Sequence, residues 1–118
     1  NTVGMKIGEL AQLVDGNVVC GHAMLDREIE YAFASDLMSD VLTVRADKLL
    51  LITGLANMQA VRTAEMADIP AIVFVRNKTI SEDMIQLAED NGIVLIESPF
   101  TMFRASGILY SKGVKPVY

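Results

Sequence analysis

Side chains that could perform nucleophilic catalysis or hold a metal are few in this sequence of 118 residues. It contains one histidine, His22, and one cysteine, Cys20. A serine or cysteine nucleophile needs a positioned base beside it, and a zinc site needs three or four ligands. One histidine and one cysteine supply neither, so we expect no catalytic triad, no metal and no cofactor. We interpret Cys20 as a small buried hydrophobic residue.

Carboxylates occur in pairs that could in principle serve acid–base catalysis. Asp36 and Asp40 are four residues apart, and Glu82–Asp83 and Glu89–Asp90 are adjacent. We expect each pair at a helix end or on an exposed helix face, where solvation and the helix dipole account for it. The sequence therefore predicts a protein that is not an enzyme. An enzyme with an unfamiliar site built on Asp36, Asp40, Arg76 or Lys78 ranks third among the hypotheses.

Polar side chains follow three predicted strands at the point where each strand ends. Carboxyl ends of parallel strands meet at one sheet edge, where free N–H groups and helix dipoles attract anions. We expect a polar, mildly cationic ligand site there, comprising Thr53, Gly54, Asn57, Arg76, Lys78, Ser98 and Thr101. The first of these loops matches neither a Walker A loop nor GxGxxG. On the alternative interpretation, Gly54 only permits a tight turn and Asn57 only caps a helix.

The charge balance argues against a nucleic-acid partner. The net charge is −5, whereas binding to a phosphate backbone needs clustered lysine and arginine. The sequence has no apolar run of eighteen residues and no charged and then apolar leader, so we expect neither membrane insertion nor secretion. A lone cysteine forms no internal disulfide, and we expect a cytoplasmic setting. We predict one domain over residues 5–118, with residues 1–4 a tag remnant or disordered extension.

Hydrophobic periodicity predicts alternating strands and helices. Apolar runs predict strands over 18–21, 28–34, 48–52, 71–75 and 93–96, with a loop over 22–27. Helical spacing predicts five helices. The first covers 6–14 and the last runs from Ser98–Pro99 to 109. The three between them are each capped by a polar residue and run from Ser35 or Asp36 to 42, from Asn57 to 68 and from Ser81 to 90, and a tail follows over 112–116. This order predicts an α/β fold with three layers, α/β/α, around a mostly parallel mixed sheet that has an antiparallel component near the N-terminus.

Four segments of the sequence resemble the DRTGG domain family, which is itself similar to the N-terminal domain of HPr kinase/phosphorylase. They are the segment over 34–42, Leu50-Leu51-Ile52-Thr53-Gly54, Ile69-Pro70-Ala71-Ile72-Val73-Phe74 and Gly92-Ile93-Val94-Leu95. The eponymous Asp-Arg and Thr-Gly-Gly elements have no counterpart, because Leu55-Ala56 and Arg76-Asn77-Lys78 stand in those regions. The resemblance implies an α/β/α domain of the kind found in HPr kinase. It also implies a regulatory or ligand-sensing role and a tendency to form dimers.

The leading hypothesis is a non-catalytic regulatory module that works as a homodimer and binds a nucleotide or phosphorylated metabolite at the carboxyl edge of the sheet. A partner enzyme or kinase would detect its state. The alternative is a protein interaction domain without a small ligand. It would use the methionines or the apolar start of the last helix, Phe100, Met102 and Phe103, which is either buried or a self-association patch. For the methionines on predicted helices, core or interface packing is the favoured interpretation.

Overall fold

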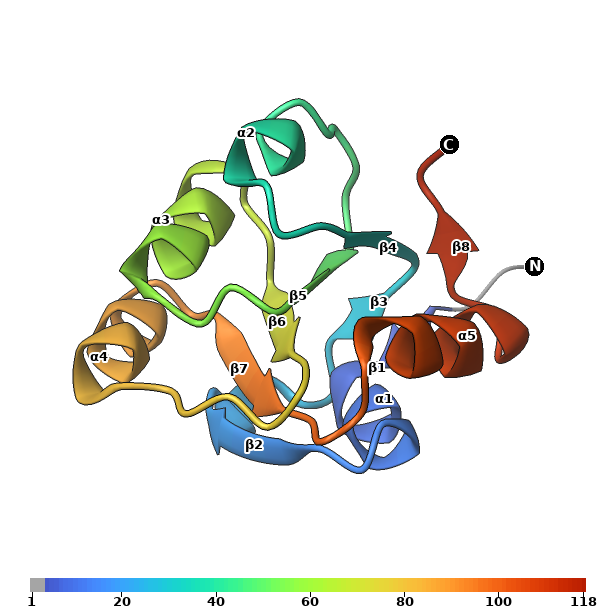
Figure 1. Ribbon diagram of the computed structural model, residues 1–118, viewed down its shortest axis with the longest axis horizontal. Helices are drawn as coiled ribbons and strands as arrows, with labels where there is room; N and C mark the ends of the chain where they lie inside the picture. Colours follow the sequence, from blue (N-terminus) through green and yellow to red (C-terminus); the bar gives the residue numbers. More distant parts are fainter. Residues whose placement is uncertain (1–3) are drawn as a thin grey trace.

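One six-stranded sheet organises the described chain, residues 4–118 of the computed structural model (Figure 1). The strand order is β2-β7-β6-β5-β4-β8. The strands are β2 (Asn17–Cys20), β4 (Tyr31–Ala34), β5 (Leu49–Thr53), β6 (Ala71–Phe74), β7 (Val94–Glu97) and β8 (Lys115–Pro116). A separate antiparallel pair joins β1 (Met5–Lys6) to β3 (Glu28–Ile29). The predicted extension over 1–4 lies outside the described residues except for Gly4.

Five of the six strands run parallel. The strands β4 to β7 pair in parallel, β8 is parallel to β4, and β2 is antiparallel to β7. Every residue of β5 and β6 is buried, which is typical of parallel strands covered on both faces. The predicted α/β class, with a mostly parallel mixed sheet and an antiparallel strand from the N-terminal part of the chain, is confirmed.

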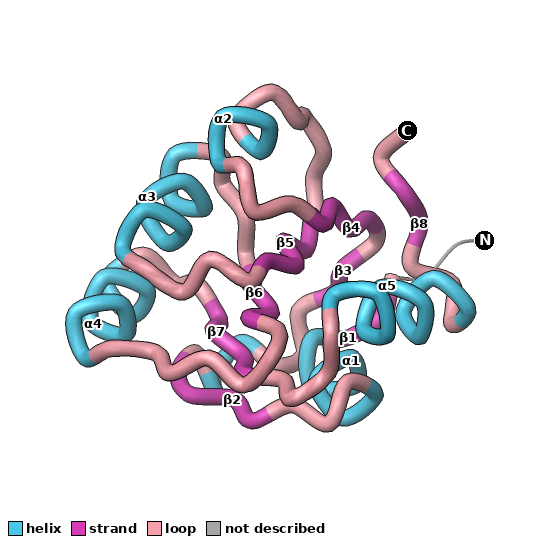
Figure 2. Tube along the Cα trace, in the orientation of Figure 1, coloured by secondary structure: helices cyan, strands magenta, loops and turns pink. Residues whose placement is uncertain are grey.

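Helices cover both faces of the sheet and make three layers (Figure 2). They are α1 (Ile7–Leu13), α2 (Met38–Val41), α3 (Met58–Met66), α4 (Glu82–Asp90) and α5 (Met102–Ser111), with a short 3₁₀ turn, η1 (His22–Met24), in the predicted loop. The first face carries α2, α3 and α4, and the other carries α1 and α5. Within residues 4–118 no helix has the length and apolarity needed to cross a bilayer.

Side-chain alternation along β5 links the two hydrophobic cores. Leu49 and Leu51 pack with α2, α3 and α4, whereas Leu50 and Ile52 pack with α1 and α5. Successive side chains of a strand point to opposite faces, so one continuous apolar run serves both cores. The same run positions the polar Thr53 at the carboxyl end of the strand.

Two predicted helix starts are wrong. The helix expected to be capped by Ser35 or Asp36 begins at Met38, because the Ser35 hydroxyl accepts the Leu37 N–H at 3.0 Å and Asp36 bonds to a neighbouring loop. The last helix begins at Met102 with Thr101 as its cap, not at Ser98–Pro99. The carbonyl of Ser98 instead accepts a hydrogen bond from the loop after β6. Both errors place a helix where tertiary hydrogen bonds hold an extended loop.

Two smaller expectations also need correction. The single strand expected over 28–34 is divided, since its first part pairs with β1 and its second with β5. Part of the tail over 112–116 forms β8 on the edge of β4. Among the helical methionines, for which core or interface packing was expected, Met38 and Met84 are buried in the core, whereas Met66 is 67 % exposed and retains only the interface alternative.

Candidate functional site

The carboxyl ends of β4, β5, β6 and β7 lie along one edge of the sheet, because these four strands are parallel. The loops that leave them cover residues 35–37, 54–57, 75–81 and 98–101. Every residue of the predicted ligand site lies at the end of one of these strands or in the loop that follows it. The topology therefore supports the expected edge, and the side-chain contacts decide which residues share a surface.

Asp36 ties the loop after β4 to the end of β5. Its Oδ1 accepts the Gly54 N–H at 2.7 Å and the Thr53 hydroxyl at 3.0 Å. The hydroxyl of Thr53, a fully buried residue, accepts in turn the N–H of Leu55 at 3.1 Å. A carboxylate of this chain thus already occupies the N–H group and hydroxyl that a phosphate cradle at this loop would use.

Arg76 brings positive charge to the same place. A Cβ on Gly54 would lie 3.2 Å from Arg76 Nη2 and 3.5 Å from either carboxylate oxygen of Asp36. The side chains of Arg76 and Asp36 therefore both lie close to Gly54, where a Cβ would be in tight contact with the guanidinium. Within residues 4–118 Arg76 forms no ion pair with a carboxylate, so its guanidinium retains donors for an external anion.

Arg76 and its neighbour adopt a costly backbone conformation. Arg76 has φ +66° and Asn77 φ +57°, in the left-handed region that residues other than glycine rarely adopt. The Arg76 N–H donates to the Phe100 carbonyl at 2.8 Å, and the Asn77 N–H donates to the Ser98 carbonyl at 3.0 Å. The ring of Phe100 lies under the guanidinium of Arg104 at 3.8 Å. These contacts hold the loops after β6 and β7 together and fix where Arg76 projects.

The other predicted site residues have structural partners or stand apart. Asn57 accepts the Ala60 N–H and caps α3, and Thr101 accepts the Arg104 N–H and caps α5. Ser98 is buried, donates to the Val14 carbonyl at 2.7 Å and accepts the Phe100 N–H. Lys78 is half-buried in the loop after β6. The contacts therefore bring together Thr53, Gly54 and Arg76, and they add Asp36.

Sequence reasoning placed Asp36 at a solvated helix end and missed its role. Its hydrogen bonds reach residues 17 and 18 positions away, and no local pattern encodes such a pairing. One signal was available, since an aspartate directly after a predicted parallel strand lies at the same edge as the neighbouring loops.

The lone cysteine and histidine do not form a site. Cys20 is buried on β2 with its Sγ 3.7 Å from the Ile93 carbonyl, and burial raises the pKa of its thiol above the ordinary value. His22 is exposed. No cluster of three potential metal ligands occurs within residues 4–118.

Comparison with known proteins supports the fold. No family model and no curated protein matches the sequence. A similar solved structure is that of the CBS and DRTGG domains of the regulatory region of Clostridium perfringens pyrophosphatase, complexed with its activator diadenosine tetraphosphate. The TM-score is 0.72 at 14 % sequence identity, over 92 % of this chain and 46 % of that chain. The chain thus spans less than half of that regulatory region, and the likeness supports a DRTGG-like fold.

Proposed function

We propose that this chain is a ligand-sensing regulatory module that binds a nucleotide at the carboxyl edge of its sheet. The observation that carries the proposal is that Arg76 and Asp36 both lie within 3.5 Å of the place that a Cβ on Gly54 would take. A guanidinium binds phosphate oxygens with its fork of donors. Both hydrogen bonds that Asp36 accepts within residues 4–118 end on Oδ1, which leaves Oδ2 to accept a hydrogen bond from a hydroxyl group of a ligand.

This pairing of charges favours a particular class of ligand. Inorganic phosphate would be repelled by the carboxylate of Asp36. A nucleotide instead offers a phosphate to Arg76 and a sugar hydroxyl to Asp36. The structural neighbour supports the class, since that regulatory region was solved with a dinucleotide activator. Arg76 and Asn77 are the one adjacent pair among the five non-glycine residues with positive φ in residues 4–118, and backbone strain of this kind is common at ligand-binding sites. Phosphorylated sugars satisfy the same two groups and belong in the test.

Thermal unfolding with a panel of nucleotides, sugar phosphates and inorganic phosphate tests the proposal. A ligand at one hundred times its dissociation constant adds about 2.7 kcal/mol to the free energy of unfolding. We expect a nucleotide to raise the midpoint more than inorganic phosphate does. Arg76→Ala should remove the shift and Arg62→Ala, a change on the exposed face of α3, should retain it. No shift with any member of the panel, or an equal shift in Arg76→Ala, refutes the proposal.

The module is further proposed to act as a homodimer. Leu37, Leu42 and Met66 are 58 %, 38 % and 67 % exposed, and they lie on or beside α2 and α3, which pack against each other. Exposed apolar side chains of this size favour association. Light scattering after size-exclusion chromatography should show twice the monomer mass at high concentration. One monomeric peak at every concentration contradicts the dimer.

A second candidate function is a protein interaction domain without a small ligand. Phe103 on α5 is 89 % exposed and favours it, because contiguous exposed aromatic residues are typical of interaction surfaces. The partner would be an enzyme or kinase whose activity the module controls. If no ligand shifts the thermal midpoint, and both Arg76→Ala and Lys78→Ala leave partner binding intact, this candidate replaces the first.

A further inference from the structure

A hollow of about 330 Å³ lies on the α5 face of the sheet, between α5 and the strands β5, β4 and β8. Small side chains leave it open. Ala32 and Ala34 of β4 line it, and at Gly107 of α5 a Cβ would meet nothing within 4 Å among residues 4–118. Pockets that hold small ligands begin at about 300 Å³, so the hollow has room for a fused ring system.

Aromatic side chains flank this opening. Phe103 and Tyr110 both line the hollow and are 89 % and 68 % exposed. They are seven residues apart on α5, and so lie on one helix face, two turns from each other. Between them lie Ser106 and Gly107. Two exposed rings beside an apolar depression offer stacking and edge contacts to a flat ligand.

The lining also contains a hydroxyl without a partner. Ser106 Oγ is shielded from solvent and has no hydrogen-bond partner within residues 4–118. A buried, unsatisfied hydroxyl destabilises the folded chain, and a helical serine commonly avoids this cost by bonding to a carbonyl one turn earlier. Because Ser106 lines the hollow, a rotation of its side chain that exposes the hydroxyl would let a polar atom of a bound molecule satisfy it.

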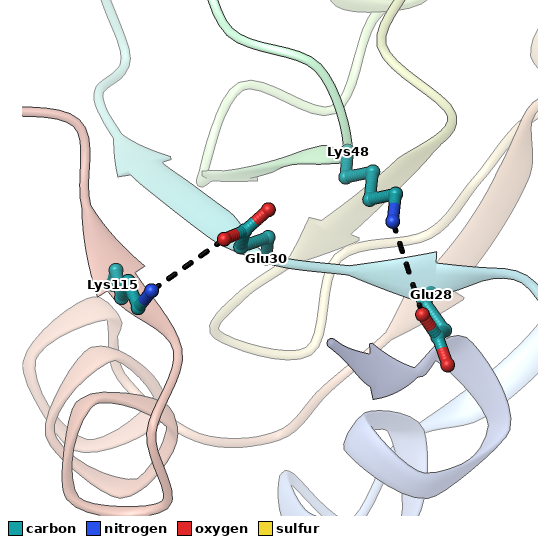
Figure 3. A network of polar contacts seen from close by, with 4 residues as sticks. All are labelled: Glu28, Glu30, Lys48 and Lys115. Atoms are coloured by element: carbon teal, nitrogen blue, oxygen red, sulfur yellow. Dashed lines mark hydrogen bonds and ion pairs between the residues drawn. The ribbon is translucent and has the colours of Figure 1, made fainter. Parts of the chain in front are cut away.

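A lysine is the one charged residue among those that line the hollow. The net charge is −5, yet residues 98–118 contain Arg104, Lys112 and Lys115 and no aspartate or glutamate. Lys115 lines the hollow, and its Nζ lies 3.5 Å from Glu30 Oε2 (Figure 3). Such a partly exposed pair contributes little stability, and an ammonium has three donors. Lys115 is therefore able to bind an additional anionic group.

We propose that this hollow binds a flat, apolar ring system that carries an anionic group, with the rings between Phe103 and Tyr110 and the anion at Lys115. The site is separate from the one at Gly54, and it stands whether or not the chain binds a nucleotide there. Its occupant combines the two properties of the lining, apolar surface and local positive charge. A small carboxylate without rings would leave the apolar part empty, and an uncharged hydrocarbon would leave Lys115 without an anion.

Fluorescence titration of the full chain with 8-anilino-1-naphthalenesulfonate, a ring system with one sulfonate, tests the proposal. We expect saturable binding of one molecule per chain. Gly107→Leu places a side chain in the hollow and should weaken binding at least tenfold. Gly107→Ala is its matched control, because both changes remove the conformational freedom of glycine from the helix while alanine adds only one methyl group. We expect its affinity to stay within threefold of the unmodified chain.

The charge requirement has its own pair of variants. Lys115→Gln should weaken binding of the sulfonate about fivefold or more and leave binding of uncharged N-phenyl-1-naphthylamine unchanged. Lys48→Gln is the control, since Lys48 forms the equivalent ion pair with Glu28 (Figure 3) and does not line the hollow. Equal losses for both probes in Lys115→Gln refute the role of charge. Circular dichroism and thermal unfolding confirm that each variant is folded.

Three outcomes overturn the site itself. Non-saturable fluorescence indicates non-specific binding, and equal affinity in Gly107→Leu places the probe elsewhere. The third outcome combines two observations. The affinity for the probe falls as the protein concentration rises, and Phe103→Ser dissociates a dimer of the unmodified chain. Together they assign the hollow to a second copy of the chain. Arg76→Ala should leave probe binding unchanged. A failure of the hollow to bind the probe and a failure of the Gly54 site to bind a nucleotide are therefore measured separately.

Discussion

At the scale of single residues, the contacts of Asp36 lead to the clearest expectation. Its carboxylate satisfies the Gly54 N–H and the hydroxyl of the buried Thr53. Asp36→Ala leaves both donors without this partner, and hydrogen bonds to a charged group contribute about 1.5–3 kcal/mol. We expect the free energy of unfolding, measured in urea, to fall by about 1.5–3 kcal/mol. Asp40→Ala, at an exposed position of α2, should change it by less than about 0.5 kcal/mol.

Cys20 gives a pH dependence with a definite sign. Burial raises the pKa of its thiol in the folded chain above the ordinary value of about 8.5. Above that pH the unfolded chain releases a proton that the folded chain retains, so the free energy of unfolding falls as the pH rises from about 8.5 to the folded pKa. We expect urea unfolding at pH 7 and pH 9.5 to show a smaller fall in Cys20→Ala than in the unmodified chain. Identical falls contradict the assignment to Cys20.

At the scale of elements, the conformation of the loop after β6 should lower the stability of the fold while it positions Arg76 for binding. Arg76 has φ +66°, which costs a side-chain-bearing residue roughly 1–2 kcal/mol, whereas glycine adopts it freely and loses some entropy on folding. Arg76→Gly should therefore raise the free energy of unfolding by about 0.5–1 kcal/mol while abolishing the nucleotide shift. Arg62→Gly, inside α3, should lower it by a similar amount. A loss of stability in Arg76→Gly contradicts this account of the loop.

The elements also show which features a sequence reveals. Asn57 and Ser81 were predicted as caps and are caps, because each bonds an N–H three residues further along the same helix. The buried strands β5 and β6 were predicted because each contains an unbroken apolar run, 49–52 and 71–74. The starts of α2 and α5 were missed, since Asp36 and the carbonyl of Ser98 bond to loops from other strands. Local hydrogen bonds follow from residue types at fixed spacing, and tertiary bonds require the sheet order.

For the candidate site the same distinction holds. The strand order placed Thr53, Gly54 and Arg76 at one edge, as expected from parallel strands. The caps Asn57 and Thr101 and the buried Ser98 were included because polar residues in loops look alike in a sequence, whether they bind a ligand or satisfy the backbone. The hollow beside α5 was not anticipated, because it arises from small residues on two elements whose packing the sequence does not specify.

At the scale of the whole molecule, the two cores should unfold together. Ile72 packs against α2, α3 and α4, and Ile96 packs on the opposite face against α1 and α5; both are fully buried. Ile72→Ala and Ile96→Ala should each lower the free energy of unfolding by about 2–5 kcal/mol. We expect each variant to retain one cooperative transition in urea, with coincident far-UV dichroism and tyrosine fluorescence. Two separated transitions in either variant would show that the layers unfold independently.

The antiparallel edge strand β2 has a consequence for how the chain is made. Asn17 pairs with Glu97, 80 positions later. At synthesis rates of roughly 5–20 residues per second, β2 waits on the order of 4–16 s on the ribosome before its partner β7 exists. During this interval the backbone groups of β2 and its valines have no sheet to join. The nascent chain is therefore most exposed to mispairing and to chaperone capture at its N-terminal end, and β7 ends that interval.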